Sequence, residues 1–252
     1  MAEIKLVINE DYGALTDFIE GLPMSFLRSG EVVYSGRNLI KTFEIDGLKL
    51  NVKSFKKPIF INQVAYATFR KSKARRSYEY AFRLKENGFH TPDPVAYMEL
   101  KEGGLLKYCL YISVHEEFDG MMRELYSGTL EGREELLLQF ARYTAFLHEK
   151  QILHLDYSSG NILYKKKEED NFTFYLVDLN RMKFGKPIDL KTACFNFRRL
   201  WGSDEMISFI VKKYAKMRNF DEETCLRKTF EYRKSFWDTF SKQHPGAKPY
   251  EG

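Results

Sequence analysis

Residues 154–163 read HLDYSSGNIL, and residues 176–180 read LVDLN. Each polar side chain in these two stretches has chemistry that phosphoryl transfer needs. Asp156 can accept or orient the proton of an attacking hydroxyl, with His154 beside it. Asn161 and Asp178 offer the hard oxygen ligands that Mg²⁺ prefers. We therefore expect Asp156 and His154 to be catalytic and Asn161 and Asp178 to bind metal, because this transfer depends mainly on positioning and charge neutralisation.

The order and spacing of these residues carry more weight than their types. Aspartate and asparagine are common in turns, where they cap helices and bond the backbone, so a lone His-x-Asp would indicate little. Here a complete His-x-Asp-x-x-x-x-Asn motif is followed by an apolar run and a second aspartate. That pattern matches the catalytic loop of protein-kinase-like enzymes.

Composition and charge agree with a soluble globular chain that has an anionic partner. The 252 residues can build one large core or two small lobes, and 44% of them are hydrophobic and 30% charged. The formal net charge of +5 is unevenly spread, because residues 49–85 contain eleven Lys or Arg and one acid, Glu79. Such a segment suits phosphate, anionic lipid or nucleic acid, although a solvated helix face has the same composition.

Cysteine usage and hydropathy indicate the compartment. The three cysteines, Cys109, Cys194 and Cys225, are far apart and show neither zinc spacing nor a disulfide framework, which fits a reducing environment. The N-terminus lacks the pattern of a secretory signal, and no apolar run approaches the ~20 residues that cross a bilayer. We expect a cytoplasmic protein that can still touch a membrane surface.

The order of elements predicts an α+β, bilobal, protein-kinase-like fold. Turn signals at Asp46-Gly47 and Gly103-Gly104 predict two hairpins, and apolar periodicity predicts a helix near residues 72–87. The second half reads as a helix, the catalytic stretch, a hairpin and further helices (residues 133–150, 162–165 with 172–177, 189–201, 203–217 and 221–240). We expect a strand-rich, nucleotide-binding N-lobe with one main helix (residues 1–118) and a compact, mostly helical C-lobe (residues 119–252), forming one kinase-like domain.

A kinase site also needs a cation on the nucleotide phosphates and a carboxylate that holds it. Lys53 ends an alternating strand, and Glu79 follows on the predicted helix, so we expect these two to pair; Lys49 and Lys56 are the rivals of Lys53. The turn at Gly36 and Arg37 is the candidate phosphate-covering loop, although it has a single glycine and could be a plain hairpin turn. At the junction of the lobes, Glu116 and Phe118 are candidate nucleotide contacts.

The chain resembles the lipopolysaccharide kinase family, which includes Kdo kinases and core heptose kinases. The resemblance is carried by residues 36–55, 72–79 (SKARRSYE), 88–94 (GFHTPDP), 154–163 and 178–181 (DLNR). It implies ATP and Mg²⁺ as cosubstrates and a sugar hydroxyl of the lipid A–core glycolipid as acceptor, with Kdo (3-deoxy-octulosonate) as the sugar in this branch. It also implies work at the cytoplasmic face of the inner membrane, where the basic residues 70–76 would meet anionic headgroups. Nucleic acid is not an expected partner.

Departures from the protein-kinase pattern argue against a peptide substrate. Leu155 replaces the arginine that reads a phosphorylated activation loop, Asn180 replaces the glycine of Asp-Phe-Gly, and no Ala-Pro-Glu follows. Arg181 fits either a phosphate or acceptor contact or a structural ion pair. The sequence leaves open a small-molecule phosphotransferase of the aminoglycoside or choline kinase type, a RIO-like atypical protein kinase, and a nucleotide-binding pseudokinase. It does not predict the oligomeric state.

Overall fold

The computed structural model describes residues 2–56 and 71–251. The chain divides into two compact units: Met1–Glu86 with Thr91–Glu117, and Asn87–His90 with Phe118–Gly252. Arg70, the first residue of the expected basic membrane segment, lies outside the described residues.

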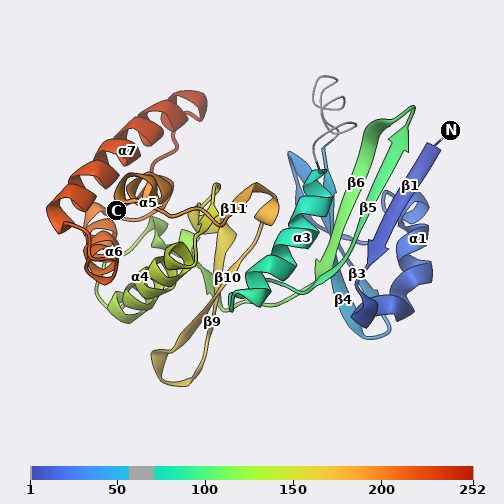
Figure 1. The fold of residues 1–252 in the computed structure, drawn as a ribbon, viewed down its shortest axis with the longest axis horizontal. Coiled ribbons are helices and arrows are strands. Elements are labelled where there is room, and N and C mark those ends of the chain that lie inside the picture. Colours follow the sequence, from blue (N-terminus) through green and yellow to red (C-terminus); the bar gives the residue numbers. More distant parts are fainter. Residues whose placement is uncertain (1, 57–70, 252) are drawn as a thin grey trace. The chain divides into compact units, whose positions relative to one another are not determined.

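The first unit is built on an antiparallel sheet of six strands (Figure 1). Both predicted hairpins form, β3 with β4 and β5 with β6, and β4 pairs with β6 to join them. In sheet order the strands are β1 (Ala2–Ile8), β5 (Pro94–Glu102), β6 (Leu105–Val114), β4 (Leu48–Phe55), β3 (Asn38–Ile45) and β2 (Glu31–Ser35).

Two helices pack on opposite faces of this sheet. Successive strand residues point to opposite faces, so Leu50 and Val52 join one core cluster, with α1 (Thr16–Ser25) and the turn η1 (Glu10–Leu15) before it. Phe55 instead joins Ala74 and Tyr78 of α3 (Lys73–Glu86) in a second cluster. The sequence predicted α3 but not α1, whose segment contains Gly21 and Pro23, residues that weaken a helical pattern.

The second unit contains the helices and the hairpin that the sequence predicted, together with very short strands that it did not. The helices are α4 (Glu134–Glu149), α5 (Leu190–Phe197), α6 (Asp204–Met217) and α7 (Glu222–Gln243). One small sheet orders β10 (Phe172–Leu176), β9 (Ile162–Lys166) and β7 (Gly120–Met121), and another pairs β11 (Met182–Phe184) with β8 (Ile152–His154). Short 3-10 turns connect them: η2 (Met122–Tyr126), η3 (Ser159–Asn161), η4 (Glu168–Asp170) and η5 (Leu179–Arg181).

A polar cluster is buried where α4 packs on α6. His148 is 1% exposed, and its Nδ1 lies 2.8 Å from the Tyr214 hydroxyl. That hydroxyl accepts a hydrogen bond from the Arg218 guanidinium at 3.2 Å, which leaves its own proton for Nδ1. Burial, and then the charge of Arg218, lower the pKa of His148 to about 3. The core therefore holds this imidazole in its neutral form.

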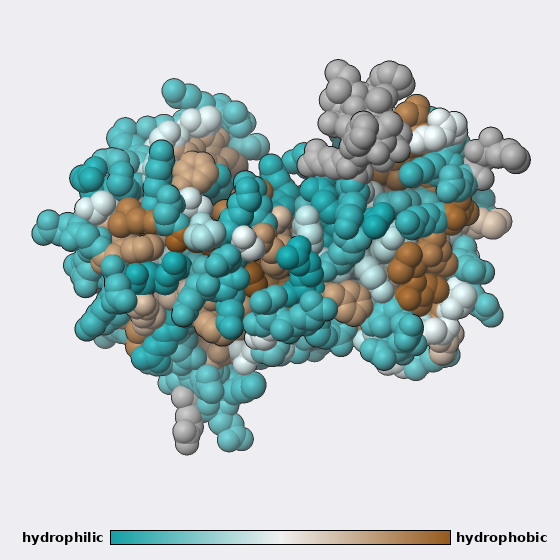
Figure 2. All heavy atoms as spheres, viewed as in Figure 1, coloured by the Kyte–Doolittle hydropathy of each residue, from teal (hydrophilic) through white to brown (hydrophobic). Residues whose placement is uncertain are grey.

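The three cysteines are free and buried. Burial raises the pKa of the Cys109 thiol to about 11 and that of Cys225 to about 12, and it raises the pKa of Cys194 as well. Within the described residues no helix combines the length and apolar character needed to span a membrane. The face drawn in Figure 2 is mostly hydrophilic, with separate hydrophobic patches.

Acid should destabilise the fold through His148. The unfolded chain protonates this histidine below its ordinary pKa of about 6.5, whereas the folded chain resists protonation down to about pH 3, so stability is complete above pH 6.5 and falls as the pH is lowered. Between pH 7 and pH 5 the loss from this residue should be about 2 kcal/mol. Urea unfolding at both pH values should show a smaller acid loss in His148→Gln than in the wild type. An identical loss in both proteins would contradict this account.

Candidate active site

His154 fixes the position of the predicted catalytic loop. It ends β8, is fully buried, and accepts a hydrogen bond at Nδ1 from the Asp156 backbone N–H, at 3.1 Å. Because Nδ1 is an acceptor, the proton lies on Nε2, which donates to the Val177 carbonyl at 3.0 Å. Burial lowers the pKa of His154, which favours this neutral form. One imidazole thus connects the backbone at Asp156 to the residue preceding Asp178.

Asp156 lies beside this imidazole with its carboxylate paired. The Arg199 guanidinium donates to Asp156 Oδ1, and the two side chains are 25% and 20% exposed. The Asp156 backbone carbonyl accepts a hydrogen bond from Asn161 Nδ2 at 2.9 Å. That bond uses the amide nitrogen of Asn161 and leaves its Oδ1 as the atom that can serve as a ligand.

Asp178, two residues after the end of β10, has the left-handed backbone conformation, with φ of 57° and ψ of 49°. The Asn180 amide donates to Asp178 Oδ1, and Asn180 is itself buried. The Val177 N–H donates to the Asn161 carbonyl at 3.1 Å, so the backbone next to Asp178 is bonded to Asn161. An amide oxygen and a carboxylate on adjoining segments form a donor set that suits Mg²⁺. In the described ranges no group of three or more His, Cys, Asp and Glu side chains is arranged so that it could hold a metal ion.

Two residues of this site were missed by the sequence analysis. Arg199 follows α5, 43 residues after Asp156, and Asn196 on α5 donates from Nδ2 to the His154 carbonyl at 3.1 Å. The adjacent pair Arg198-Arg199 is a sequence signal for Arg199, whereas Asn196 belongs to no motif. Arg181, left open by the sequence, is exposed, and its backbone carbonyl accepts from the Leu155 N–H at 2.8 Å.

In the first unit, Lys53 and Glu79 occupy the same side of the sheet. Lys53 shares a strand face with Phe55, whose ring centroid lies 5.2 Å from Lys53 Nζ and which packs against α3. Glu79 lies on α3 and accepts from Lys71 Nζ at 2.6 Å and from Arg75 Nε at 2.7 Å. These bonds lower the pKa of Glu79 although burial acts in the opposite direction. The Lys53–Glu79 pair stays a prediction.

The other candidate nucleotide contacts are Gly36, Arg37, Glu116 and Phe118. Gly36 and Arg37 form the exposed turn between β2 and β3, and a Cβ on Gly36 would come within 2.6 Å of the Tyr34 hydroxyl oxygen. Glu116 is half-buried near the end of the first unit. Phe118 opens the long segment of the second unit, and its ring centroid lies 5.1 Å from that of Tyr175.

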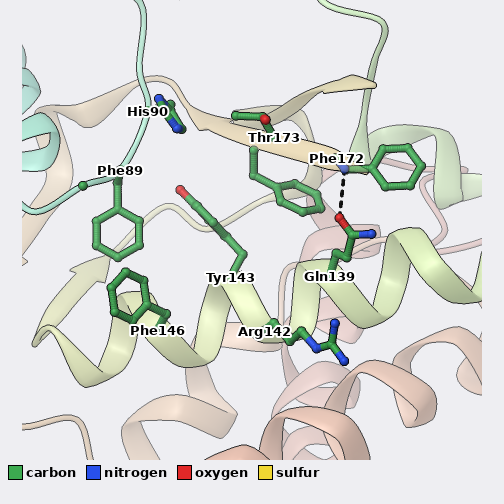
Figure 3. Close-up of a pocket in the computed structure, with 10 residues that line it drawn as sticks. Phe89, His90, Gln139, Arg142, Tyr143, Phe146, Phe172 and Thr173 are labelled. Atoms are coloured by element: carbon green, nitrogen blue, oxygen red, sulfur yellow. Dashed lines mark hydrogen bonds between the residues drawn. The ribbon is translucent and has the colours of Figure 1, made fainter. Parts of the chain in front are cut away.

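Two cavities in the second unit differ in character. One, of about 300 Å³, is lined by Arg123, Arg199 and aromatic side chains as well as by Ser158, Gly160 and Asn161. It therefore adjoins the cluster around Asp156. The other, of about 320 Å³, contains no predicted site residue and is largely aromatic. Figure 3 shows it between α4 and β10, with Phe89, Tyr143 and Phe146 on one side and the bond from the Phe172 N–H to Gln139 Oε1 on the other.

Comparisons with known proteins agree with this arrangement. The model of the lipopolysaccharide kinase (Kdo/WaaP) family matches residues 19–219. A solved structure of WaaP in complex with acyl carrier protein is similar to this chain with a TM-score of 0.61 and 17% identity, covering 92% of this chain and 99% of that one. The structure of a microcompartment-associated aminopropanol kinase follows with a TM-score of 0.53 and 10% identity, covering 91% of each chain. No curated protein matches the chain. The likeness to these structures confirms the protein-kinase-like fold.

Proposed function

Because the chain belongs to the lipopolysaccharide kinase (Kdo/WaaP) family and is an ATP-dependent kinase, we propose that it phosphorylates a sugar hydroxyl of the lipopolysaccharide inner core, with Kdo on lipid A as the acceptor sugar. One observation carries the proposal: hydrogen bonds through His154 and Asn161 hold Asp156 and the backbone beside Asp178 in one cluster. A phosphotransferase needs these groups fixed relative to one another.

Within this cluster the proposed roles follow from the donors and acceptors. Asp156 orients the acceptor hydroxyl and accepts its proton, while His154 holds the backbone of Asp156 in place. Asn161 Oδ1 and the Asp178 carboxylate would hold Mg²⁺, which when bound neutralises phosphate charge. Asn180 fixes the orientation of the Asp178 carboxylate.

In the first unit, Lys53 is the proposed partner of the nucleotide phosphates. Lys53 is half-buried on the α3 side of the sheet, whereas its rivals Lys49 and Lys56 are exposed. Glu79 would position Lys53 and shares its charge with Lys71 and Arg75. Gly36, Arg37, Glu116 and Phe118 remain proposed nucleotide contacts, which the ATP affinity of variants at these positions would test.

The charge beside Asp156 favours an anionic acceptor. Phosphotransferases for aminoglycosides or choline bind cationic substrates and need acidic acceptor pockets, whereas the cavity at Asp156 carries Arg123 and Arg199. An inner-core glycolipid, which bears carboxylate and phosphate groups, suits this charge. The small-molecule alternative of that type therefore has less support than the glycolipid.

Phosphate transfer should depend on Asp156 and Asp178 in different ways. With γ-³²P-labelled ATP and a Kdo-containing lipid A precursor, Asp156→Asn should lower kcat by about 10²–10⁴-fold and leave ATP binding intact, because it removes the proposed base and none of the proposed nucleotide contacts. Asp178→Asn should raise the Mg²⁺ concentration needed for half-maximal rate. Asp238→Asn on the exposed part of α7 is the matched control. Undiminished transfer by Asp156→Asn would remove this residue from the central role, and label found only in a soluble acceptor or in protein would favour the alternatives.

A double-mutant cycle on ATP affinity tests the Lys53–Glu79 pair. If Glu79 positions Lys53, then Lys53→Met and Glu79→Gln should each weaken ATP binding, and the double variant should be no weaker than the worse single one. Lys71, which pairs with Glu79 in the structure and has a side chain that is 51% exposed, supplies the control cycle. Calorimetric titration with ATP and Mg²⁺ gives the four affinities. Additive losses for Lys53 and Glu79 would show that the two residues act independently.

We also propose contact with an anionic membrane at the cytoplasmic face of the inner membrane through residues 70–76. Each basic side chain near such a surface contributes about 1 kcal/mol, and Lys71 keeps half of its side chain exposed. Co-sedimentation with vesicles of anionic phospholipid should decrease in the variant Lys71→Gln/Lys73→Gln and in high salt. Equal sedimentation of variant and wild type would place the membrane contact elsewhere or exclude it.

A further inference from the structure

The cavity beside Asp156 has the composition of a binding site for a charged sugar. Its wall combines two cations, two indoles and two further aromatic rings, in addition to the loop residues that lead to Asn161 (Arg123, Arg199, Trp201, Phe236, Trp237, Phe240, Ser158, Gly160 and Asn161). All of these residues belong to the second unit. We call this set the arginine–tryptophan cavity.

The two arginines are held in place by ring contacts, and part of their hydrogen-bonding capacity is unused. The Arg123 guanidinium lies 4.8 Å from the Trp201 ring centroid and has no carboxylate partner among the described residues. The Arg199 guanidinium lies 5.4 Å from the Phe236 ring centroid, and its buried Nε has no acceptor within the described ranges. A planar guanidinium presents several donors in a fork that matches a carboxylate or a phosphate.

The tryptophans supply an apolar wall with one further donor. Trp201 and Trp237 meet edge to face with ring centroids 5.9 Å apart. Trp237 is 7% exposed, and its buried indole Nε1–H has no acceptor in the described part of the chain. A buried donor without an acceptor is costly, and this one belongs to a residue of the cavity wall.

We propose that the arginine–tryptophan cavity is the acceptor subsite, that it binds an anionic sugar, and that Arg123 and Arg199 bind the sugar's negative group. Arg199 also has a second role, which is to pair with Asp156 when no acceptor is bound. Without acceptor its guanidinium pairs with Asp156 Oδ1, so binding of the anion draws Arg199 away and exposes the carboxylate to the acceptor hydroxyl. The naming of this cavity as the acceptor subsite rests on the proposed function, whereas its affinity for the anionic sugar does not.

Both tryptophans of the chain line this cavity, so intrinsic fluorescence reports its occupancy directly. Free Kdo should change the tryptophan emission of the wild type in a saturable way, and Kdo methyl ester, which lacks the carboxylate charge, should bind at least about tenfold more weakly. Arg123→Gln should weaken binding of the acid by a similar factor and leave binding of the ester unchanged. Arg227→Gln, whose exposed guanidinium pairs with Glu231 and lies outside the cavity, is the matched control and should behave as the wild type does.

Inorganic phosphate identifies the source of the anion. If phosphate changes the emission in an Arg123-dependent manner and acid and ester bind equally, then the site takes a phosphate group of the glycolipid and the anion site stands. The proposal is overturned if neither Kdo nor phosphate changes the emission up to about 10 mM, or if Arg123→Gln weakens acid and ester alike. Because Arg123 is exposed, its replacement should leave the melting temperature close to that of the wild type, and thermal melting of each variant checks this.

Kinetics separate this proposal from the proposed function. In the labelled-ATP assay Arg123→Gln should raise the KM for the glycolipid about tenfold while the KM for ATP stays the same. Normal transfer with an unchanged glycolipid KM would overturn the role of the cavity and leave the kinase activity established. Saturable binding of Kdo without any transfer to the glycolipid would overturn the proposed function and leave the anion site established.

Discussion

A single neutral imidazole determines how the second unit presents its reactive groups. His154 accepts from the Asp156 N–H on one nitrogen and donates to the Val177 carbonyl with the other, so it bridges two segments that are more than 20 residues apart. Protonation would place a proton on Nδ1, against the N–H of Asp156, and full burial opposes the charge. Asn196 anchors the same residue from α5. The loop, the strand end and the helix therefore depend on one side chain.

In the structure the Asp156 carboxylate pairs with Arg199, and it is this pair that the proposed acceptor would replace. Both side chains are three-quarters or more covered, so water screens the pair only in part, yet neither charge is fully desolvated. Such a pair is stable enough to order the site and weak enough to be exchanged when a ligand brings a better anion for Arg199. Burial lowers the pKa of Arg198, and the charges of Arg199 and Arg181 act in the same direction. The neighbourhood thus favours binding of negative charge.

The sequence predicted what is local and missed what depends on distant contacts. The hairpin at Asp46-Gly47 and the helix α3 follow from turn chemistry and periodicity, and both form. The strands β8 and β11 have three residues each, which is too few to show an alternating apolar pattern in the sequence. They become visible only through their pairing in the fold, in which His154 lies opposite Met182. Arg199 belongs to no sequence motif. Its ion pair with Asp156 becomes visible only in the fold, where the end of α5 lies beside the predicted catalytic loop. The helix α1 is stabilised by burial of Ile19 and Leu22 on the sheet, and this overrides the weak local propensity of its sequence.

Because all three thiols are buried, a labelling reagent aimed at an introduced cysteine should leave the natural cysteines unmodified. Maleimides and nitroxide reagents react with accessible thiolates, and Cys109, Cys194 and Cys225 are both covered and hard to deprotonate. One new cysteine on each compact unit would then carry a probe without removing any native residue. Pulsed electron–electron double resonance or single-molecule energy transfer between the two probes would then measure the distance between the units through a catalytic cycle. The native core residues of the enzyme would stay unaltered.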